Sequence, residues 1–305
     1  MFMKLFSIDD TKLKTIKKDN FKIEKDLQVL TEENLKLIFG LEFVRTEFPL
    51  DNLRIDTLAF DNESNSFVII EYKRGSSDSV IDQGYAYLSL LLNNKADFIL
   101  EYNEKLGKSL RKGKVDWSQS KIIFIAENFS KYQLKSIEFN DLPFELWEVN
   151  KYDNQTISYN KIKVPENKVS ISTINNNSSK ISTEIKKYTE YYHLSKASAE
   201  IKQLYEDIRD EVQTEFELEI IPRKTYISFK NNGVNIFDIE FKKNNLKMFI
   251  NLKKGELKDP EKIARDVSTI GHHSVGDYDL DVNPVDSNIY YIMNLIRQSY
   301  DKNVL

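Results

Sequence analysis

The sequence contains no cysteine among its 305 residues, which limits the chemistry it can support. Disulfide bonds, thiolate catalysis and cysteine-ligated zinc are excluded, so any metal must be held by oxygen or histidine. No apolar run approaches the roughly 18 residues typical of a membrane span. The N-terminal stretch MFMKLFSIDD is interrupted by charges, unlike a signal peptide. We therefore expect a cytoplasmic protein with no membrane partner.

A surplus of positive charge, which dedicated nucleic-acid binders usually carry, is also lacking, because the net charge is −4. A local exception is the basic run EKLGKSLRKGKVDW at 104–117. It contains three residues that we take as candidate DNA contacts: Lys108, Arg111 and Lys112. The alternative is a solvated loop, which charge runs usually form.

The length of the chain predicts about two domains. The clearest break is the segment 166–184, where asparagine and serine are dense and aromatic residues are missing. We therefore expect a domain at 1–165, a linker at 166–184 and a second domain at 185–305. No internal period of 20 to 50 residues is visible, which argues against a repeat architecture.

Hydrophobic spacing in the first domain predicts a helical opening, an antiparallel meander of three strands, a helix and three further buried strands. The expected ranges are 21–40 for the helix or helix pair, 41–48, 53–61 and 66–73 for the meander, 79–92 for the next helix, and 96–102, 121–127 and 144–149 for the buried strands. Ser79 is the expected N-cap of the helix at 79–92. The order αβββαβ, with additions, predicts an α/β fold.

The second domain is expected to be a smaller α+β domain with an antiparallel sheet. A strongly periodic helix is predicted at 196–216 and another at 287–300. Between them four strands are expected at 218–221, 225–229, 234–241 and 246–252, with a turn at Asn232-Gly233.

Three charged residues lie in the predicted meander where apolar residues would be expected. Glu71 and Lys73 alternate with apolar residues and so project from one face of their strand, about 7 Å apart. Strand pairing can bring Asp56 beside Glu71. Charges in such strands are costly unless they are paired or bound to metal, and two carboxylates suit Mg²⁺. The alternative is a set of buried ion pairs with Lys73 and Arg54.

Four short stretches surround these charges in a fixed order: EKDLQ at 24–28, LRID at 53–56, VIIEYK at 68–73 and DQGYAY at 82–87. They resemble the PD-(D/E)XK nuclease superfamily, especially its NucS-like and RecB-like members. Such families place a glutamate on the first helix, an aspartate on the second strand, E-x-K on the third strand and Q-x-x-x-Y on the following helix. The matching side chains are Glu24, Asp56, Glu71, Lys73, Gln83 and Tyr87.

The resemblance implies a role for each of these residues. Asp56 and Glu71 would hold the metal, and Lys73 would support the nucleophile and the transition state. Gln83 would orient that lysine or touch a phosphate, with Tyr87 on the same helix face. Glu24 would complete the metal site directly or through a water. Arg54 is expected to contact the substrate backbone or form a salt bridge.

The second half contains KTYISF at 224–229, DVSTIGHHSVGDYDL at 266–280 and YYIMNLIRQSY at 290–300. These segments resemble a DUF5655-type domain, which carries no secure activity. We expect it to serve recognition, dimerisation or regulation. His272 and His273 are expected to form structural hydrogen bonds rather than a metal site.

Together these features predict an Mg²⁺- or Mn²⁺-dependent DNA endonuclease, without an organic cofactor, that hydrolyses phosphodiester bonds by metal-activated water. Genome defence or repair is the setting that the resemblance implies. RNA as substrate and a homodimeric state stay open. The alternative is a nuclease-like module that binds nucleic acid or a partner without cleaving, regulated by the C-terminal domain.

Overall fold

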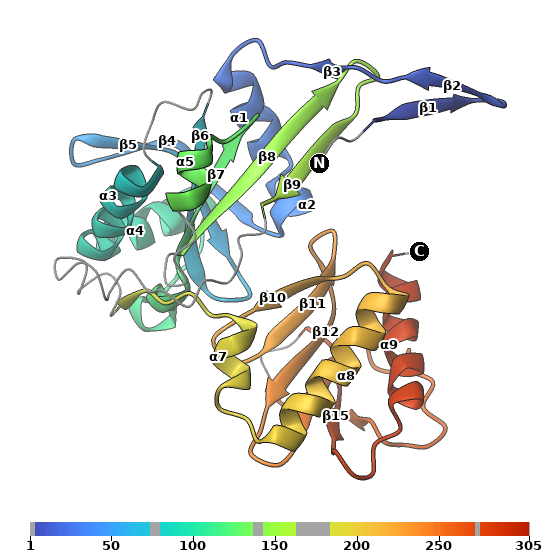
Figure 1. Ribbon diagram of the computed structural model, residues 1–305. Helices are drawn as coiled ribbons and strands as arrows, with labels where there is room; N and C mark the ends of the chain where they lie inside the picture. The colour runs from blue at the N-terminus through green and yellow to red at the C-terminus, as the bar shows by residue number, and fades with distance from the viewer. Residues whose placement is uncertain (1–3, 74–79, 137–142, 163–183, 272–274, 305) are drawn as a thin grey trace. The chain divides into compact units, whose positions relative to one another are not determined.

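The computed structural model describes residues 4–73, 80–136, 143–162, 184–271 and 275–304. The chain forms two compact units, Met1–Lys187 and Tyr188–Leu305, each with its own core (Figure 1). Of the expected linker at 166–184, only Glu184 lies within the described residues, and Ser79, the expected N-cap, lies outside them. No helix in the described ranges has the length and apolar character needed to cross a membrane.

The first unit is built on a mixed sheet with the strand order β3-β8-β7-β6-β5-β4, and β9 pairs with β8. Strands β4, β5 and β6 form the predicted antiparallel meander, whereas β6, β7 and β8 are parallel. Their bounds are β3 Lys18–Asp19, β4 Glu42–Leu50, β5 Leu53–Asp61, β6 Ser66–Lys73, β7 Lys121–Ala126, β8 Phe144–Tyr152 and β9 Ile157–Lys161.

Helices cover both faces of this sheet (Figure 1). On one face Leu27 and Leu35 pack with Ile70 and Tyr72, and on the other face Leu88 packs with the opposite set of strand residues. The helices are α1 Glu24–Glu33, α2 Leu35–Phe39, α3 Val80–Asn93, α4 Lys95–Leu106 and α5 Lys131–Ser136, with short 3-10 turns η1 Lys112–Lys114 and η2 Trp117–Gln119. The predicted helix pair at 21–40 is thus confirmed, with its break at Asn34.

One predicted element of the first unit is wrong. The segment 96–102, expected from its sequence to be a buried strand, lies inside helix α4. Phe98 and Tyr102 are four residues apart and share the buried side of the helix, where they pack against the rings of Phe67 and Phe60. A short apolar run satisfies either a strand or a buried helix, so the sequence pattern could not separate them.

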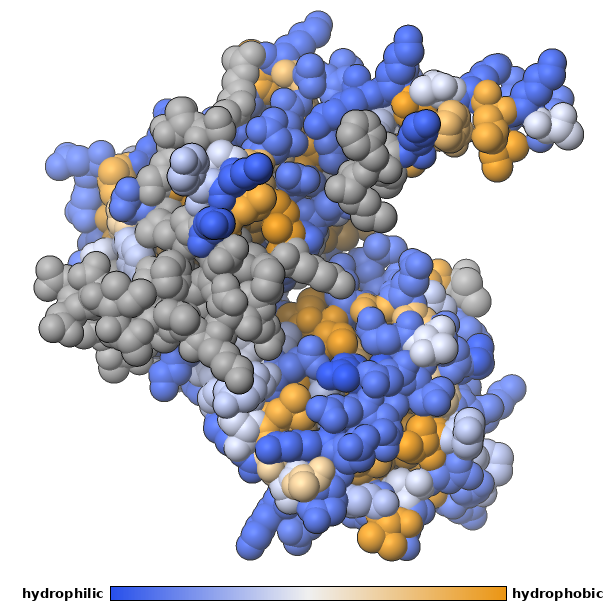
Figure 2. All heavy atoms as spheres, in the orientation of Figure 1, coloured by the Kyte–Doolittle hydropathy of each residue, from blue (hydrophilic) through white to orange (hydrophobic). Residues whose placement is uncertain are grey.

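A hairpin near the N-terminus was not predicted. Strands β1 (Phe6–Asp9) and β2 (Lys12–Thr15) pair only with each other, joined by a two-residue turn in which Asp10 has a φ of 54°. The hairpin projects beyond the main sheet of its unit (Figure 1), and hydrophobic side chains lie along it beside polar ones (Figure 2).

The second unit is a six-stranded antiparallel sheet in the order β10-β11-β12-β13-β15-β14, packed against helices α8 and α9. The predicted turn at Asn232-Gly233 joins β11 to β12, with both residues at positive φ. The bounds are β10 Glu219–Pro222, β11 Ile227–Asn231, β12 Val234–Phe241, β13 Leu246–Ile250, β14 Arg265–Asp266, β15 Tyr278–Val282, α7 Glu190–Leu194, α8 Ala199–Glu215 and α9 Ile289–Val304. The predicted fold class, an α/β unit followed by a smaller antiparallel α+β unit, is confirmed.

Candidate active site

The strand register brings the predicted acidic pair together. Thr57 on β5 lies opposite Ile70 on β6, so one further step places Asp56 opposite Glu71. Both Glu71 and Lys73 are buried, with exposed fractions of 6% and 9%. The position is also at the carboxyl end of the parallel part of the sheet, because Lys73 pairs with Ala126, the last residue of β7. Ligands of α/β sheets commonly bind at such edges.

Glu71 is the centre of the polar contacts. Its Oε1 lies 3.3 Å from Lys73 Nζ and accepts a hydrogen bond from Gln83 Nε2. Its Oε2 lies 2.9 Å from the Tyr87 hydroxyl, which is also 3.1 Å from the carbonyl oxygen of Arg54. Gln83 and Tyr87 are one turn apart on α3, so both reach the same carboxylate. Asp56 shares a further side-chain hydrogen bond with Glu71, so five of the six predicted side chains contact one another.

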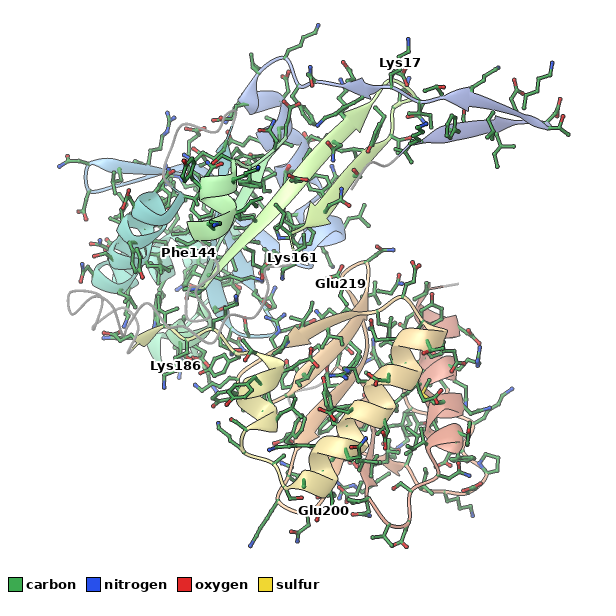
Figure 3. The ribbon with its side chains drawn as sticks, in the orientation of Figure 1. Lys17, Phe144, Lys161, Lys186, Glu200 and Glu219 are labelled. Carbon is green, nitrogen blue, oxygen red and sulfur yellow. The ribbon has the colours of Figure 1, made fainter. Side chains whose placement is uncertain are left out.

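Close packing of α3 on the sheet holds these side chains in place. Gly84 lies between Gln83 and Tyr85, and a Cβ at this position would collide with the ring of Phe144 at the start of β8 (Figure 3). Glycine is thus required here for the helix to approach the strands. That approach is what lets Gln83 reach Glu71.

Asp56 is fixed by the neighbouring strand. Its Oδ2 accepts a hydrogen bond from the backbone N–H of Tyr72 at 3.1 Å. Helix α1 supports the same residue from the other side of the sheet, because Gln28 Nε2 donates to the backbone oxygen of Asp56 at 2.9 Å. Gln28 was not identified from the sequence. The available signal was its spacing of four from Glu24, which puts both on one side of α1.

Burial raises the pKa of both carboxylates. It is the largest influence on Glu71, and with the charge of Asp56 it raises the pKa of Glu71 to about 7. Burial likewise raises the pKa of Asp56, against the lowering effect of the Tyr72 N–H. Burial raises the pKa of the Tyr87 hydroxyl as well, so it stays protonated and can donate. Because these two adjacent acids resist ionising together, a cation bound between them would be stabilising.

Other predicted residues lie at the border of the site. Glu24 is exposed at the start of α1, one turn before Gln28. Arg54 forms an ion pair with Glu47 at 2.6 Å, and Lys25 contacts the same glutamate at 3.0 Å. These two cations lower the pKa of Glu47, although burial opposes them. The alternative hypothesis was a set of ion pairs of Asp56 and Glu71 with Lys73 and Arg54. Lys73 does form an ion pair with Glu71, whereas Arg54 forms its ion pair with Glu47.

The structure does not bring the predicted basic run to this site. Lys108 contacts both oxygens of Glu42, at 2.6 and 2.8 Å, and its charge is neutralised there. Glu42 lies opposite Phe60, which is four residues along β5 from Asp56, a separation of about 13 Å. Arg111 and Lys112 are exposed on the segment that follows α4. His272 and His273 lie outside the described residues.

Comparison with known proteins identifies one similar domain. The family model described as "Domain of unknown function (DUF5655)" matches residues 190–303, which confirms the expected C-terminal resemblance.

Solved structures match only in part. A repair endonuclease from Pyrococcus abyssi is 20% identical with a TM-score of 0.23, covering 39% of this chain and 44% of that one. A complex of EndoMS with double-stranded DNA is 16% identical with a TM-score of 0.24, covering 43% of this chain and 47% of that one. SfsA of Pyrococcus furiosus in complex with Ca²⁺ is 15% identical with a TM-score of 0.25, covering 50% and 67%. The chain thus spans about half the length of the first two, and similarity at these TM-scores does not bear on activity.

A whole-length relative is found in Haemophilus influenzae, where an uncharacterized protein is 46% identical over 301 residues. The match covers 97% of this chain and 99% of the relative, so both the site-bearing unit and the C-terminal unit are included. The chain belongs to the same family as this Haemophilus protein.

Proposed function

We propose that this protein is a metal-dependent DNA endonuclease whose active site is formed by Asp56, Glu71 and Lys73. The observation that carries the proposal is the convergence of a buried carboxylate, Glu71, and a half-buried one, Asp56, both with raised pKa values, beside the buried Lys73. Such an arrangement costs stability, because burial penalises each charged group. A bound divalent cation and a negatively charged substrate would offset this cost by neutralising the buried charges.

The donor set fits Mg²⁺ or Mn²⁺. Asp56 and Glu71 would supply two hard oxygen ligands. Within the described residues, no three histidine, cysteine, aspartate or glutamate side chains gather closely enough to hold a metal. Waters and a substrate phosphate would therefore complete the coordination, as Mg²⁺ commonly requires. When bound, such a metal acidifies a water and neutralises charge on the phosphate.

The surrounding residues would position these groups. The Tyr72 N–H and a hydrogen bond with Glu71 fix the orientation of the Asp56 carboxylate. Gln83 and Tyr87 hold the carboxylate of Glu71 in one orientation. Lys73 provides a fixed positive charge 3.3 Å from Glu71 Oε1, where it would orient the attacking water and stabilise negative charge on the phosphate. Glu24 would bind a water at the edge of the site.

One observation favours a second candidate, a module that binds DNA or a partner without cutting. Lys73 is already paired with Glu71, as expected if the charges only stabilise the strands. In that case replacing either partner would weaken folding without removing any reaction. The C-terminal unit would serve recognition or regulation under both proposals.

Plasmid nicking separates the two candidates. Purified protein is incubated with supercoiled, linear and single-stranded DNA in Mg²⁺, Mn²⁺ or EDTA. We expect metal-dependent cleavage that falls at least 100-fold in Asp56→Ala and in Lys73→Met, because each removes a group acting on the transition state.

The matched control is Glu101→Gln. Glu101 is also a buried acid in an ion pair, accepting two hydrogen bonds of 2.8 Å from Arg45, but it lies on α4 away from the site. This variant should lose stability and keep its specific activity. Cleavage that survives both Asp56→Ala and Lys73→Met, or that is absent from the wild-type protein with every metal and substrate, would reject the nuclease.

A further inference from the structure

The N-terminal hairpin and the segment that follows it carry a local excess of positive charge. Residues 6–22, FSIDDTKLKTIKKDNFK, contain five lysines and three acids, in a chain whose net charge is −4. All five lysines are exposed. Lys14 pairs with Asp9, whereas Lys12, Lys17, Lys18 and Lys22 form no ion pair with any residue that the structure describes. We call these four the arm lysines.

The hairpin itself is amphipathic. Phe6, Ile8 and Leu13 lie on one face, since Ile8 pairs directly with Leu13. They are 42%, 79% and 64% exposed, which is high for such residues. The other face carries Lys12 and Lys14, together with their cross-strand partners Asp9 and Ser7. An isolated two-stranded hairpin is only marginally stable in water, and exposed apolar side chains often mark a binding surface. We therefore expect this hairpin to contact a binding partner.

The chain leads from the hairpin directly to the candidate active site. Lys17 lies where the hairpin joins β3 (Figure 3), and Lys18 pairs with Tyr152 at the end of β8. The backbone N–H of Phe21 then contacts Glu127, the residue after Ala126, and Ala126 is the partner of Lys73. The arm lysines therefore mark a path along the edge of the sheet at which the acidic pair lies.

We propose that this hairpin is a DNA-binding arm that lies on duplex DNA beside the site of cleavage. The proposal rests on the proposed function, because it names the substrate surface of the same site. A two-stranded β-ribbon fits the major groove of B-form DNA, and exposed lysines neutralise phosphates on either side of it.

The dimensions suit this substrate. Glu148 lies beside Ala126, and four residue steps along β8 lead from it to Tyr152, which lies beside Lys18. Six further steps along the chain lead back from Lys18 to Lys12. Ten extended residues span at most about 33 Å, close to the roughly 34 Å of one turn of B-DNA. The arm would therefore contact the duplex within about one turn of the acidic pair.

The apolar face of the hairpin is too small to form a stable dimer interface with a second copy of the chain, so DNA is the better candidate partner. Three partly exposed side chains offer on the order of 400 Å², about half of the ~800 Å² that each partner buries in a stable interface. The unpaired lysines would also repel their symmetry mates in a dimer. Their charge is complementary to a polyanion.

Binding measured without cleavage tests the arm. Fluorescence anisotropy of a labelled 30-base-pair duplex is recorded in EDTA at several salt concentrations, with the full-length protein. The arm variant carries Lys12, Lys17, Lys18 and Lys22 changed to alanine. We expect its affinity to fall at least 10-fold, and the slope of log K against log salt to flatten by about 0.9 for each phosphate that the arm no longer neutralises, up to roughly 3.6.

The matched control removes four exposed charges from the other basic run. It carries Lys105, Arg111, Lys112 and Lys114 changed to alanine, so net charge changes equally. Its salt slope should change by less than one unit. Equal or larger flattening in the control, or an effect of the arm variant on single-stranded DNA or RNA alone, would overturn the proposal.

Sedimentation of both variants completes the test. A wild-type dimer that the arm variant or Ile8→Ser dissociates would assign the hairpin to self-association and overturn the DNA arm. Because these measurements use EDTA, they decide the arm independently of whether the protein cuts DNA.

Discussion

Replacing Glu71 with glutamine should stabilise the metal-free protein above neutral pH. Burial and Asp56 raise the pKa of Glu71 from 4.5 to about 7. Below pH 4.5 both folded and unfolded chains bind this proton, so the shift costs nothing. Between pH 4.5 and 7 the folded state retains the proton while the unfolded chain loses it. Above pH 7 both states carry the charge, which is buried in the folded state and solvated in the unfolded chain. Stability contributed by the proton is therefore lost as the pH rises.

The size of the effect follows from the shift. A change from 4.5 to about 7 corresponds to roughly 3 kcal/mol at 1.36 kcal/mol per unit. Glutamine resembles the protonated acid, since it can accept from Lys73 and Gln83 and donate to Tyr87. In a unit of this size, 1 kcal/mol moves the melting temperature by about 2–4 °C, so the variant should gain roughly 6–12 °C over wild type at pH 8. The two proteins should melt alike at pH 4.5.

Thermal or urea unfolding in EDTA from pH 4.5 to 8 measures this difference. Added Mg²⁺ should remove most of the loss from wild type and leave Glu71→Gln unchanged. Glu145→Gln is the matched control, because Lys121 and Lys161 hold the pKa of Glu145 well below its usual range despite burial. This control should be less stable than wild type throughout pH 5–8, with no added slope. A wild-type protein whose stability relative to Glu71→Gln is constant across this range would refute the argument.

Three further substitutions test the supports of the site. Gly84→Ala should lose about 1–3 kcal/mol in urea unfolding and at least 10-fold in cleavage, since the new methyl group meets the Phe144 ring and displaces α3. Gln28→Leu should lose about 1–3 kcal/mol because it leaves the carbonyl it contacts on β5 buried and unsatisfied, and unchanged stability would contradict that role. Tyr87→Phe removes a hydrogen bond that lowers the pKa of Glu71. The acidic limb of its pH–rate profile should move to higher pH, and an unmoved or lowered limb would count against the contact.

Strong local patterns predicted most of the fold. The meander was predicted because 53–61 and 66–73 both have strand character and are joined by a short polar turn. Its observed register places Asp56 opposite Glu71. Helix α4 was mistaken for a strand because seven residues are too few to show helical periodicity. The two-residue turn of the N-terminal hairpin lacks glycine, so no turn signal marked it.

The polar contacts of the site were predictable only in part. Spacing within a single element placed Gln83 and Tyr87 on one side of α3, where both contact Glu71. Contacts between distant elements were not accessible in this way. The role of Gln28 depends on the packing of α1 against β5, which the sequence does not show. The distance of Lys108 from the site depends on its contact with Glu42, whose position opposite Phe60 is known only from the strand register.

The hydrogen bond from the Tyr72 amide to Asp56 makes exchange of that amide sensitive to the orientation of the Asp56 side chain. The amide of Tyr72 donates to the side-chain carboxylate of Asp56 on the neighbouring strand. Hydrogen–deuterium exchange at this amide therefore requires either rotation of Asp56 or opening of the central sheet, which is a much rarer event. Its exchange rate, set against that of a neighbouring amide in β6, would report how tightly Asp56 is held, independently of any chemical step.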